Sequence, residues 1–344
     1  MSSEIIRHRL EGKVFSPPKE AFAPNEIPTV AVWGDTLPET WENAVLAAYE
    51  FGAHIPTEYD QDVDPESRDV TMMMTVAKPF AEPRIHRAIP DSFEGLAVYV
   101  AEVVDGVHDH WVNRKGHGWS YSYHDRLFNW PGLFSWDEIL KGKKIEVPYI
   151  NTLDKLMSKL AEKQYARRNQ SITVEVPNVN QVDKLITKLA QTPYSRRAQA
   201  ITWVPQVDQP DPEPPCLQRI WCRLAKNESG YLLEMNTHWR SNDALKAAFM
   251  NTFALTELQK DIAEEIGKRM GKEIGVGRYV GMMDSFHIYG SYERKNEIAT
   301  FVSQVEKMPF ERRIIRSDNP MVIKEFEKAK ERLIKEKLTL ETST

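Results

Sequence analysis

Four groups of residues in the last third of the sequence have the types and spacing to carry chemistry. Cys216 follows two prolines, and a cysteine becomes a nucleophile where a neighbouring positive charge lowers the pKa of its thiol. Arg240, Ser241 and Asp243 lie between an expected strand and an expected helix, an arrangement that suits anion binding. Taken alone, the cysteine could be an inert buried residue and the second group a surface turn with a helix cap.

The other two groups are an amide and an aromatic pair. Asn251 falls on the apolar stripe of an expected helix, where it must be hydrogen-bonded, and its donor and acceptor match the edge of a uracil base. A buried structural asparagine is the alternative. His287 and Tyr289 share one face of an expected strand, where they could bind a sugar hydroxyl or serve as core aromatics.

The elements that must position these residues can be predicted from periodicity. Helices are expected over 40–53, 92–112, 243–271 and 319–338, and strands over 69–77, 216–225, 230–239 and 276–290. A polar turn with glycine joins the two strands that follow Pro215. If these two strands pair, Arg240 lies near Cys216.

A duplicated unit precedes the cysteine. Residues 151–175 and 180–204 repeat each other closely, and each copy predicts an amphipathic helix, a basic turn and a short strand. The first copy carries Arg167 and Arg168, and the second carries Arg196 and Arg197. Two copies indicate a duplicated unit rather than a solenoid.

Composition narrows the class of protein. The chain has 344 residues, of which 41% are hydrophobic, enough for a large core. A net charge of −5 argues against a dedicated nucleic-acid binder, and no apolar run predicts a membrane span or a signal peptide. Cys216 and Cys222 are too few for a disulfide framework, so we expect a cytoplasmic protein.

The order and spacing of these groups resemble the thymidylate synthase family, in particular its divergent archaeal-like branch. The resemblance rests on Ser195-Arg196-Arg197, Pro215-Cys216, Arg240-Ser241-Asn242-Asp243, Asn251 and His287-Ile288-Tyr289. It implies an α/β sandwich with a large, mixed, kinked β-sheet and packed helices, and a homodimer that associates sheet to sheet. We expect an irregular extension over 1–30, a single catalytic domain over 31–318 and a helical tail over 319–344.

The resemblance also implies roles for the phosphate-binding and nucleophilic residues. Cys216 would add to C6 of a pyrimidine nucleotide. Arg240 and Ser241 would hold the nucleotide phosphate from within the subunit, whereas Arg196 and Arg197 would reach the phosphate of the partner subunit. Bidentate contact with phosphate explains the use of arginine rather than lysine.

The remaining roles concern the base, the sugar and the folate. By resemblance, Asn251 would orient the uracil ring, His287 and Tyr289 would hold the deoxyribose hydroxyl, and Asp243 would contact the pterin. Cytosine-specific relatives tend to carry an aspartate at the position of Asn251, so the asparagine favours uracil. Four further candidates are Glu102 as the residue that organises water for proton transfer, with Glu94 as its alternative, Tyr123 as the catalytic tyrosine, and Arg68 as an early phosphate-binding arginine.

The implied reaction is one-carbon transfer from 5,10-methylenetetrahydrofolate to C5 of the base, without a metal. The leading hypothesis is conversion of dUMP to dTMP. The alternative is a 5-hydroxymethylase acting on dCMP, CMP or dUMP with the same folate, in which water captures the intermediate. A non-catalytic relative that binds a nucleotide or RNA is a third hypothesis, which the negative net charge and the complete set of polar residues disfavour.

Overall fold

The structure is a computed structural model that describes residues 3–17, 23, 25–113, 118–130, 178–228 and 230–343. The chain divides into a unit of residues 1–128 and 181–344 and a second unit of residues 129–180. In the second unit, Trp130 and Val179 form an antiparallel bridge. The first copy of the duplication, with Arg167 and Arg168, lies outside the described residues.

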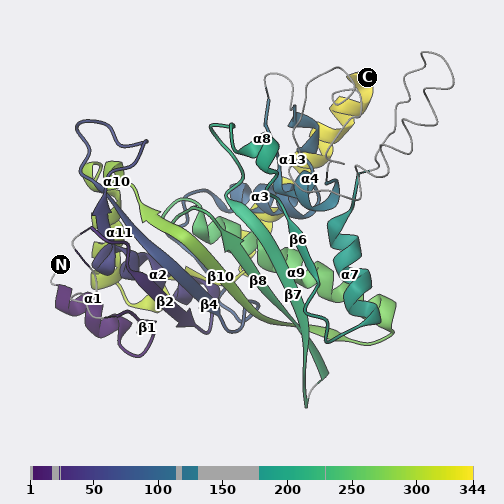
Figure 1. Ribbon diagram of the computed structural model, residues 1–344, viewed down its shortest axis with the longest axis horizontal. Helices are drawn as coiled ribbons and strands as arrows, with labels where there is room; N and C mark the ends of the chain where they lie inside the picture. Colours follow the sequence, from purple (N-terminus) through teal and green to yellow (C-terminus); the bar gives the residue numbers. More distant parts are fainter. Residues whose placement is uncertain are drawn as a thin grey trace, which may run out of the picture. The chain divides into compact units, whose positions relative to one another are not determined.

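Within the described ranges, nine strands of the first unit form one mixed sheet, which confirms the predicted class (Figure 1). The strands are β1 (Val14–Phe15), β2 (Thr29–Gly34), β3 (Ala53–Ile55), β4 (Ser67–Val76), β6 (Gln199–Ile201), β7 (Leu217–Asn227), β8 (Gly230–Trp239), β9 (Asn242–Asp243) and β10 (Ile274–Ile288). The main order is β1-β2-β4-β10-β8-β7-β6, with β3 on β4 and β9 on β10. Strand β10 runs parallel to β8 and antiparallel to β4, and its register shifts in both pairings, as expected where a strand bends at a bulge.

The described residues also form eleven α-helices. They are α1 (Ser3–Leu10), α2 (Leu37–Phe51), α3 (Phe93–Val104), α4 (Tyr123–Phe128), α7 (Gln181–Gln191), α8 (Pro205–Asp208), α9 (Ala248–Met270), α10 (Gly290–Arg294), α11 (Glu297–Lys307), α12 (Phe310–Arg313) and α13 (Pro320–Ser343). Helices α2 and α9 pack against the strands and against each other, with Trp41 and Phe249 in edge-to-face contact. A two-stranded sheet pairs β5 (Ile85–His86) with β11 (Ile314–Ile315).

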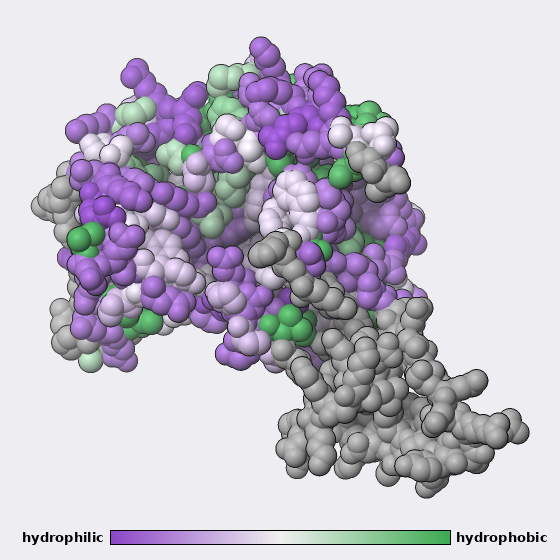
Figure 2. All heavy atoms as spheres, turned by 90° about the horizontal axis from the view of Figure 1, so that it is seen from above, coloured by the Kyte–Doolittle hydropathy of each residue, from purple (hydrophilic) through white to green (hydrophobic). Residues whose placement is uncertain are grey.

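Strand β4 shows why the helices gather on one face. Its alternating side chains bury Met72 and Met74 toward the helices and leave Met73 exposed on the opposite face. The long helix α9 is buried along most of its length and ends at Gly271, whose backbone adopts the left-handed conformation with φ of 62°. The face of the molecule shown in Figure 2 is largely hydrophilic, with apolar patches in small, separate groups.

Some expected boundaries differ from the structure. The first thirty residues, expected to be irregular, include α1, because Ile6 and Leu10 are buried in the core. The helix expected over 92–112 ends at Val104, before Gly106 with its positive φ. The helix expected from residue 243 begins at Ala248, because β9 pairs with β10 first.

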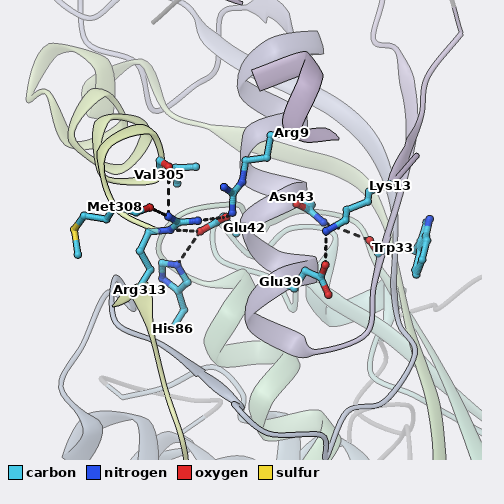
Figure 3. A network of polar contacts seen from close by, with 10 residues as sticks. All are labelled: Arg9, Lys13, Trp33, Glu39, Glu42, Asn43, His86, Val305, Met308 and Arg313. Carbon is cyan, nitrogen blue, oxygen red and sulfur yellow. Dashed lines mark hydrogen bonds and ion pairs between the residues drawn. The ribbon is translucent and has the colours of Figure 1, made fainter. Parts of the chain in front are cut away.

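A buried ion network joins the N-terminal helices to the C-terminal region (Figure 3). The carboxylate of Glu42 on α2 accepts two hydrogen bonds from Arg313 at 2.7 and 2.9 Å, contacts the His86 Nε2 at 3.1 Å and pairs with Arg9. Burial alone would raise the pKa of Glu42, but the hydrogen bonds from His86 and Arg313 and the charge of Arg9 lower it to about 2. The carboxylate is therefore ionised inside the fold.

Helix α13 occupies the predicted C-terminal helical tail and packs against α3. Among the described helices, none has an apolar stretch of the length that a bilayer crossing requires.

Candidate functional site

A cavity of about 420 Å³ lies where β7 begins, β8 and β10 end, and α3 and α9 approach the sheet. Its size is in the range of small-molecule sites. Eight of the predicted site residues line it: Glu102, Tyr123, Cys216, Ser241, Asp243, Asn251, His287 and Tyr289. All of its lining belongs to the first unit of the chain.

Strand pairing brings the nucleophile candidate and the arginine together. Leu217 lies opposite Trp239 in the antiparallel pair of β7 and β8, so the residues just outside that pair become neighbours. The backbone N–H of Arg240 donates to the Cys216 carbonyl at 2.9 Å. The Arg240 guanidinium donates to the carbonyls of Pro214 and Pro215 at 2.7 and 3.1 Å, which fixes its position beside the cysteine.

The two cysteines have different environments. Burial raises the pKa of the Cys216 thiol, and the positive charge of Arg240 opposes that rise. Cys222 is fully buried in the core, where burial raises the pKa of its thiol strongly. Cys216 is therefore the one of these two thiols that combines access to the cavity with a cation.

Asn251 is held by two neighbours. Its side chain is 7% exposed, and its Nδ2 donates to Asn242 Oδ1 at 3.0 Å. The hydroxyl of Tyr99 on α3 donates to Asn251 Oδ1 at 2.5 Å. Since each amide atom can form a second hydrogen bond, Asn251 retains one donor and one acceptor for a ligand.

The two glutamate candidates lie in different places. Glu102 lines the cavity, and its Oε1 lies 2.6 Å from Nδ1 of His108. The other ring nitrogen of His108 is 3.3 Å from Glu336 on α13. Glu94 instead pairs with Lys328 at 2.5 Å, and the charge and hydrogen bond of that lysine lower its pKa. The geometry favours Glu102 as the carboxylate that faces a ligand.

Asp243 and His287 are paired residues of the neighbouring strands β9 and β10, and this backbone pairing fixes their positions. Asp243 Oδ1 accepts from the backbone N–H groups of Leu245 and Lys246 at 2.9 and 2.8 Å, so it also orders the turn that leads into α9. The His287 ring packs edge-to-face on Tyr289, with centroids 4.5 Å apart. Burial lowers the pKa of His287, which favours the neutral imidazole.

Tyr123 is partly buried and lines the cavity. Its hydroxyl lies 3.4 Å from the backbone nitrogen of Leu217, the residue after the cysteine. Burial raises the pKa of Tyr123 well above its usual value, so the phenol stays protonated at neutral pH.

Arg68 is engaged elsewhere. Its Nε donates to Glu293 at 2.6 Å, Nη1 donates to the Tyr49 carbonyl at 2.5 Å, and its guanidinium lies over the Tyr49 ring. Its side chain is only 18% exposed. The cavity lining, as far as the chain is described, does not include it. This geometry gives no support to a phosphate-binding role for Arg68.

Arg196 and Arg197 also lie outside the cavity of their own chain, but in a different setting. Both are exposed, in the turn between α7 and β6. The Arg196 carbonyl accepts from the Trp221 indole at 3.0 Å, which fixes the backbone while the side chain remains at the surface.

The sequence interpretation did not identify the aromatic wall formed by Tyr99, Trp119 and Tyr121. Tyr99 precedes Glu102 by three residues and therefore shares its helix face, which was an available signal. Tyr121 lies two residues before Tyr123, with ring centroids 5.6 Å apart, and burial raises its pKa to about 12. Aromatic walls with a central amide suit a flat heterocyclic ring.

Two comparisons with known proteins gave matches. The family model for thymidylate synthase matches residues 108–335, which is more than half of the chain. Among solved structures, the thermostable thymidylate synthase A from Bacillus subtilis is similar, with 16% identity and a TM-score of 0.47, over 80% of this chain and 86% of that chain. The curated proteins gave no match. From the family match, the chain belongs to the thymidylate synthase family.

Proposed function

We propose that this protein transfers a one-carbon unit from 5,10-methylenetetrahydrofolate to C5 of a pyrimidine nucleotide, with dUMP as substrate and dTMP as product. The observation that carries the proposal is a cavity lined by both Cys216 and Asn251, with Arg240 held next to the cysteine by strand pairing, where its charge acts on the thiol. A nucleophile, a cation and a base-reading amide are the groups that this reaction requires from the protein.

The cysteine begins the reaction. Its thiolate adds to C6 of the pyrimidine and leaves C5 as a carbon nucleophile. Arg240 favours the thiolate, because its guanidinium opposes the effect of burial on the Cys216 thiol pKa. The folate supplies the one-carbon unit and, for a methyl product, the hydride. Release of Cys216 from C6 completes the cycle.

We assign the proton transfers to polar residues that line the cavity. Glu102, held by His108, is the group we assign to removal of the C5 proton through water. Tyr123 provides a protonated phenol beside the backbone of the nucleophile. Ser241 and Asp243 line the same cavity, and we assign the Ser241 hydroxyl to the phosphate and Asp243 to the pterin.

His287 and Tyr289 complete the nucleotide site by binding the sugar hydroxyl. Because burial lowers the pKa of His287, its imidazole is neutral and offers one donor and one acceptor. The Nε2 of His287 is buried and makes no hydrogen bond within the described part of the chain, so a ligand hydroxyl would satisfy it.

We also propose a homodimer in the cytoplasm. The open face of the sheet carries three large apolar side chains on adjacent strands, Trp33, Met73 and Met282, which are 38–48% exposed. Such a face suits a second copy of the chain. Arg196 and Arg197, exposed beside the sheet edge, would reach the partner's phosphate site.

Product mass tests the function. The protein is incubated with dUMP or dCMP and methylenetetrahydrofolate. A methylated dUMP together with dihydrofolate supports the proposal, whereas a hydroxymethylated product together with tetrahydrofolate supports the hydroxymethylase alternative. The absence of any product would contradict both.

Subunit mixing tests the shared site. A chain with Arg196→Ala and a chain with Cys216→Ser are each expected to be inactive. Their mixture is expected to recover activity, because one of the two sites in a mixed dimer then has an intact cysteine and intact partner arginines. No recovery after subunit exchange would contradict the trans arginines.

A further inference from the structure

A second asparagine lies beside the base-reading amide. Asn242 occupies β9, is 2% exposed and lines the same cavity as Asn251. Its Oδ1 accepts the hydrogen bond from Asn251 Nδ2 at 3.0 Å. Its own Nδ2 is buried and has no hydrogen-bond partner among the described residues. A buried amide donor without a partner is unfavourable, so a polar group that enters the cavity can satisfy it.

These contacts form a chain of hydrogen bonds with a direction. The Tyr99 hydroxyl donates to Asn251 Oδ1, and Asn251 Nδ2 donates to Asn242 Oδ1. Because each amide has an oxygen at one end and a nitrogen at the other, the Asn251–Asn242 bond couples the orientations of the two amides, and in the observed orientation Asn251 Oδ1 accepts from Tyr99. The free end of the chain is therefore the donor Nδ2 of Asn242.

Tyr99 supports this direction by donating to Asn251. Burial raises the pKa of its phenol far above the usual value, so it keeps its proton and can donate at any physiological pH. The reverse orientation would turn both amides and present Asn242 Oδ1, an acceptor, at the free end. The two orientations would recognise opposite groups on a ligand.

We infer that Asn242 is a specificity-determining residue, and that the Tyr99–Asn251–Asn242 chain presents its Nδ2 to the oxygen at position 4 of the base. This inference rests on the proposed function and extends it. A 4-oxo pyrimidine such as uracil offers an acceptor there, whereas a 4-amino pyrimidine such as cytosine offers a donor. With two donors facing each other, cytosine would be rejected.

The test is the ratio of the affinities for dUMP and dCMP, measured by isothermal titration calorimetry without folate. The parent chain is expected to bind dUMP more tightly. Asn242→Asp replaces the free donor with an acceptor and should shift the ratio toward dCMP by about 10–100-fold. Tyr99→Phe removes the bond that supports this direction, so it should reduce the preference for dUMP about tenfold while retaining the ring.

Asn296→Asp is the matched control, because it makes the same amide-to-carboxylate change at an exposed position before α11. Its affinity ratio should equal that of the parent. Circular dichroism confirms that each variant is folded, and Tyr99→Phe serves as the test if Asn242→Asp does not fold. If the parent binds dUMP but neither variant changes the ratio, the inference is wrong while the proposed function stands. If the parent binds neither nucleotide, the proposed function fails and this inference fails with it.

Discussion

Glu42→Gln is expected to destabilise the fold strongly at neutral pH. The substitution keeps the size of the side chain but removes the charge that faces Arg9, His86 and Arg313 inside the core. Breaking a buried ion pair by removing one partner typically costs about 3–5 kcal/mol, because the remaining charge stays buried. An amide oxygen can still accept one hydrogen bond, so we expect a loss of about 3 kcal/mol at pH 7.

The pKa of Glu42 gives the same magnitude by another route. Its usual value of 4.5 falls to about 2 in the fold, which corresponds to about 3 kcal/mol of stability. Because the folded pKa is lower than the unfolded one, this stability is present above pH 4.5 and is lost as the pH falls toward 2. Glu42→Gln lacks this titration. The difference in the free energy of unfolding between parent and variant should therefore narrow by about 1.4 kcal/mol from pH 7 to pH 3.5.

Urea unfolding followed by circular dichroism at both pH values measures this gap. Asp35→Asn is the control, because the Asp35–Lys78 pair is more than half exposed and its loss should cost less than about 1 kcal/mol. A gap for Glu42→Gln below about 1 kcal/mol at pH 7, or one that is equal at the two pH values, would refute the reasoning.

Three further predictions concern the site and one helix end. Arg240→Leu should slow alkylation of Cys216 by iodoacetamide and move the pH–rate profile of alkylation to higher pH. The reason is that the variant lacks the cation that opposes the burial-induced rise in the thiol pKa. An unchanged profile would contradict this. Glu102→Gln should abolish turnover, whereas its dUMP affinity, measured by calorimetry, should change less than about threefold. Glu94→Gln should have normal turnover, because Glu94 pairs with Lys328. Equal losses of turnover in both variants would argue against Glu102. Gly271→Ala should lower the free energy of unfolding by about 1 kcal/mol in a urea titration, because φ is 62° there and a Cβ would meet no atom within 4 Å; no loss would mean that the backbone rearranges.

Local periodicity predicted much of the scaffold. The alternating strands that became β7 and β8 and the apolar stripe of α9 were visible in the sequence because each buries one regular face. Pairing of β7 with β8 then places Arg240 beside Cys216. That adjacency follows from a short hairpin, which is a local feature.

Features that depend on distant pairing could not be predicted. Strand β9 exists because it pairs with β10, some forty residues later, so the sequence predicted a helix directly from residue 243. Arg68 was predicted to bind phosphate, because its partner Glu293 is 225 residues away in sequence and the ion pair could not be foreseen. The position of Tyr99 against Asn251 depends on how α3 packs on α9, which no local pattern specifies.

The central claim is that Cys216 is the nucleophile of a one-carbon transfer to a pyrimidine. Intact-protein mass spectrometry after incubation with 5-fluoro-dUMP and methylenetetrahydrofolate tests it directly, because fluorine at C5 prevents the proton loss that would release the adduct. We predict a covalent adduct that contains the nucleotide and the folate, mapped by peptide digestion to Cys216 and absent in Cys216→Ser. No adduct with the parent chain, or an adduct that persists in Cys216→Ser, would contradict the account.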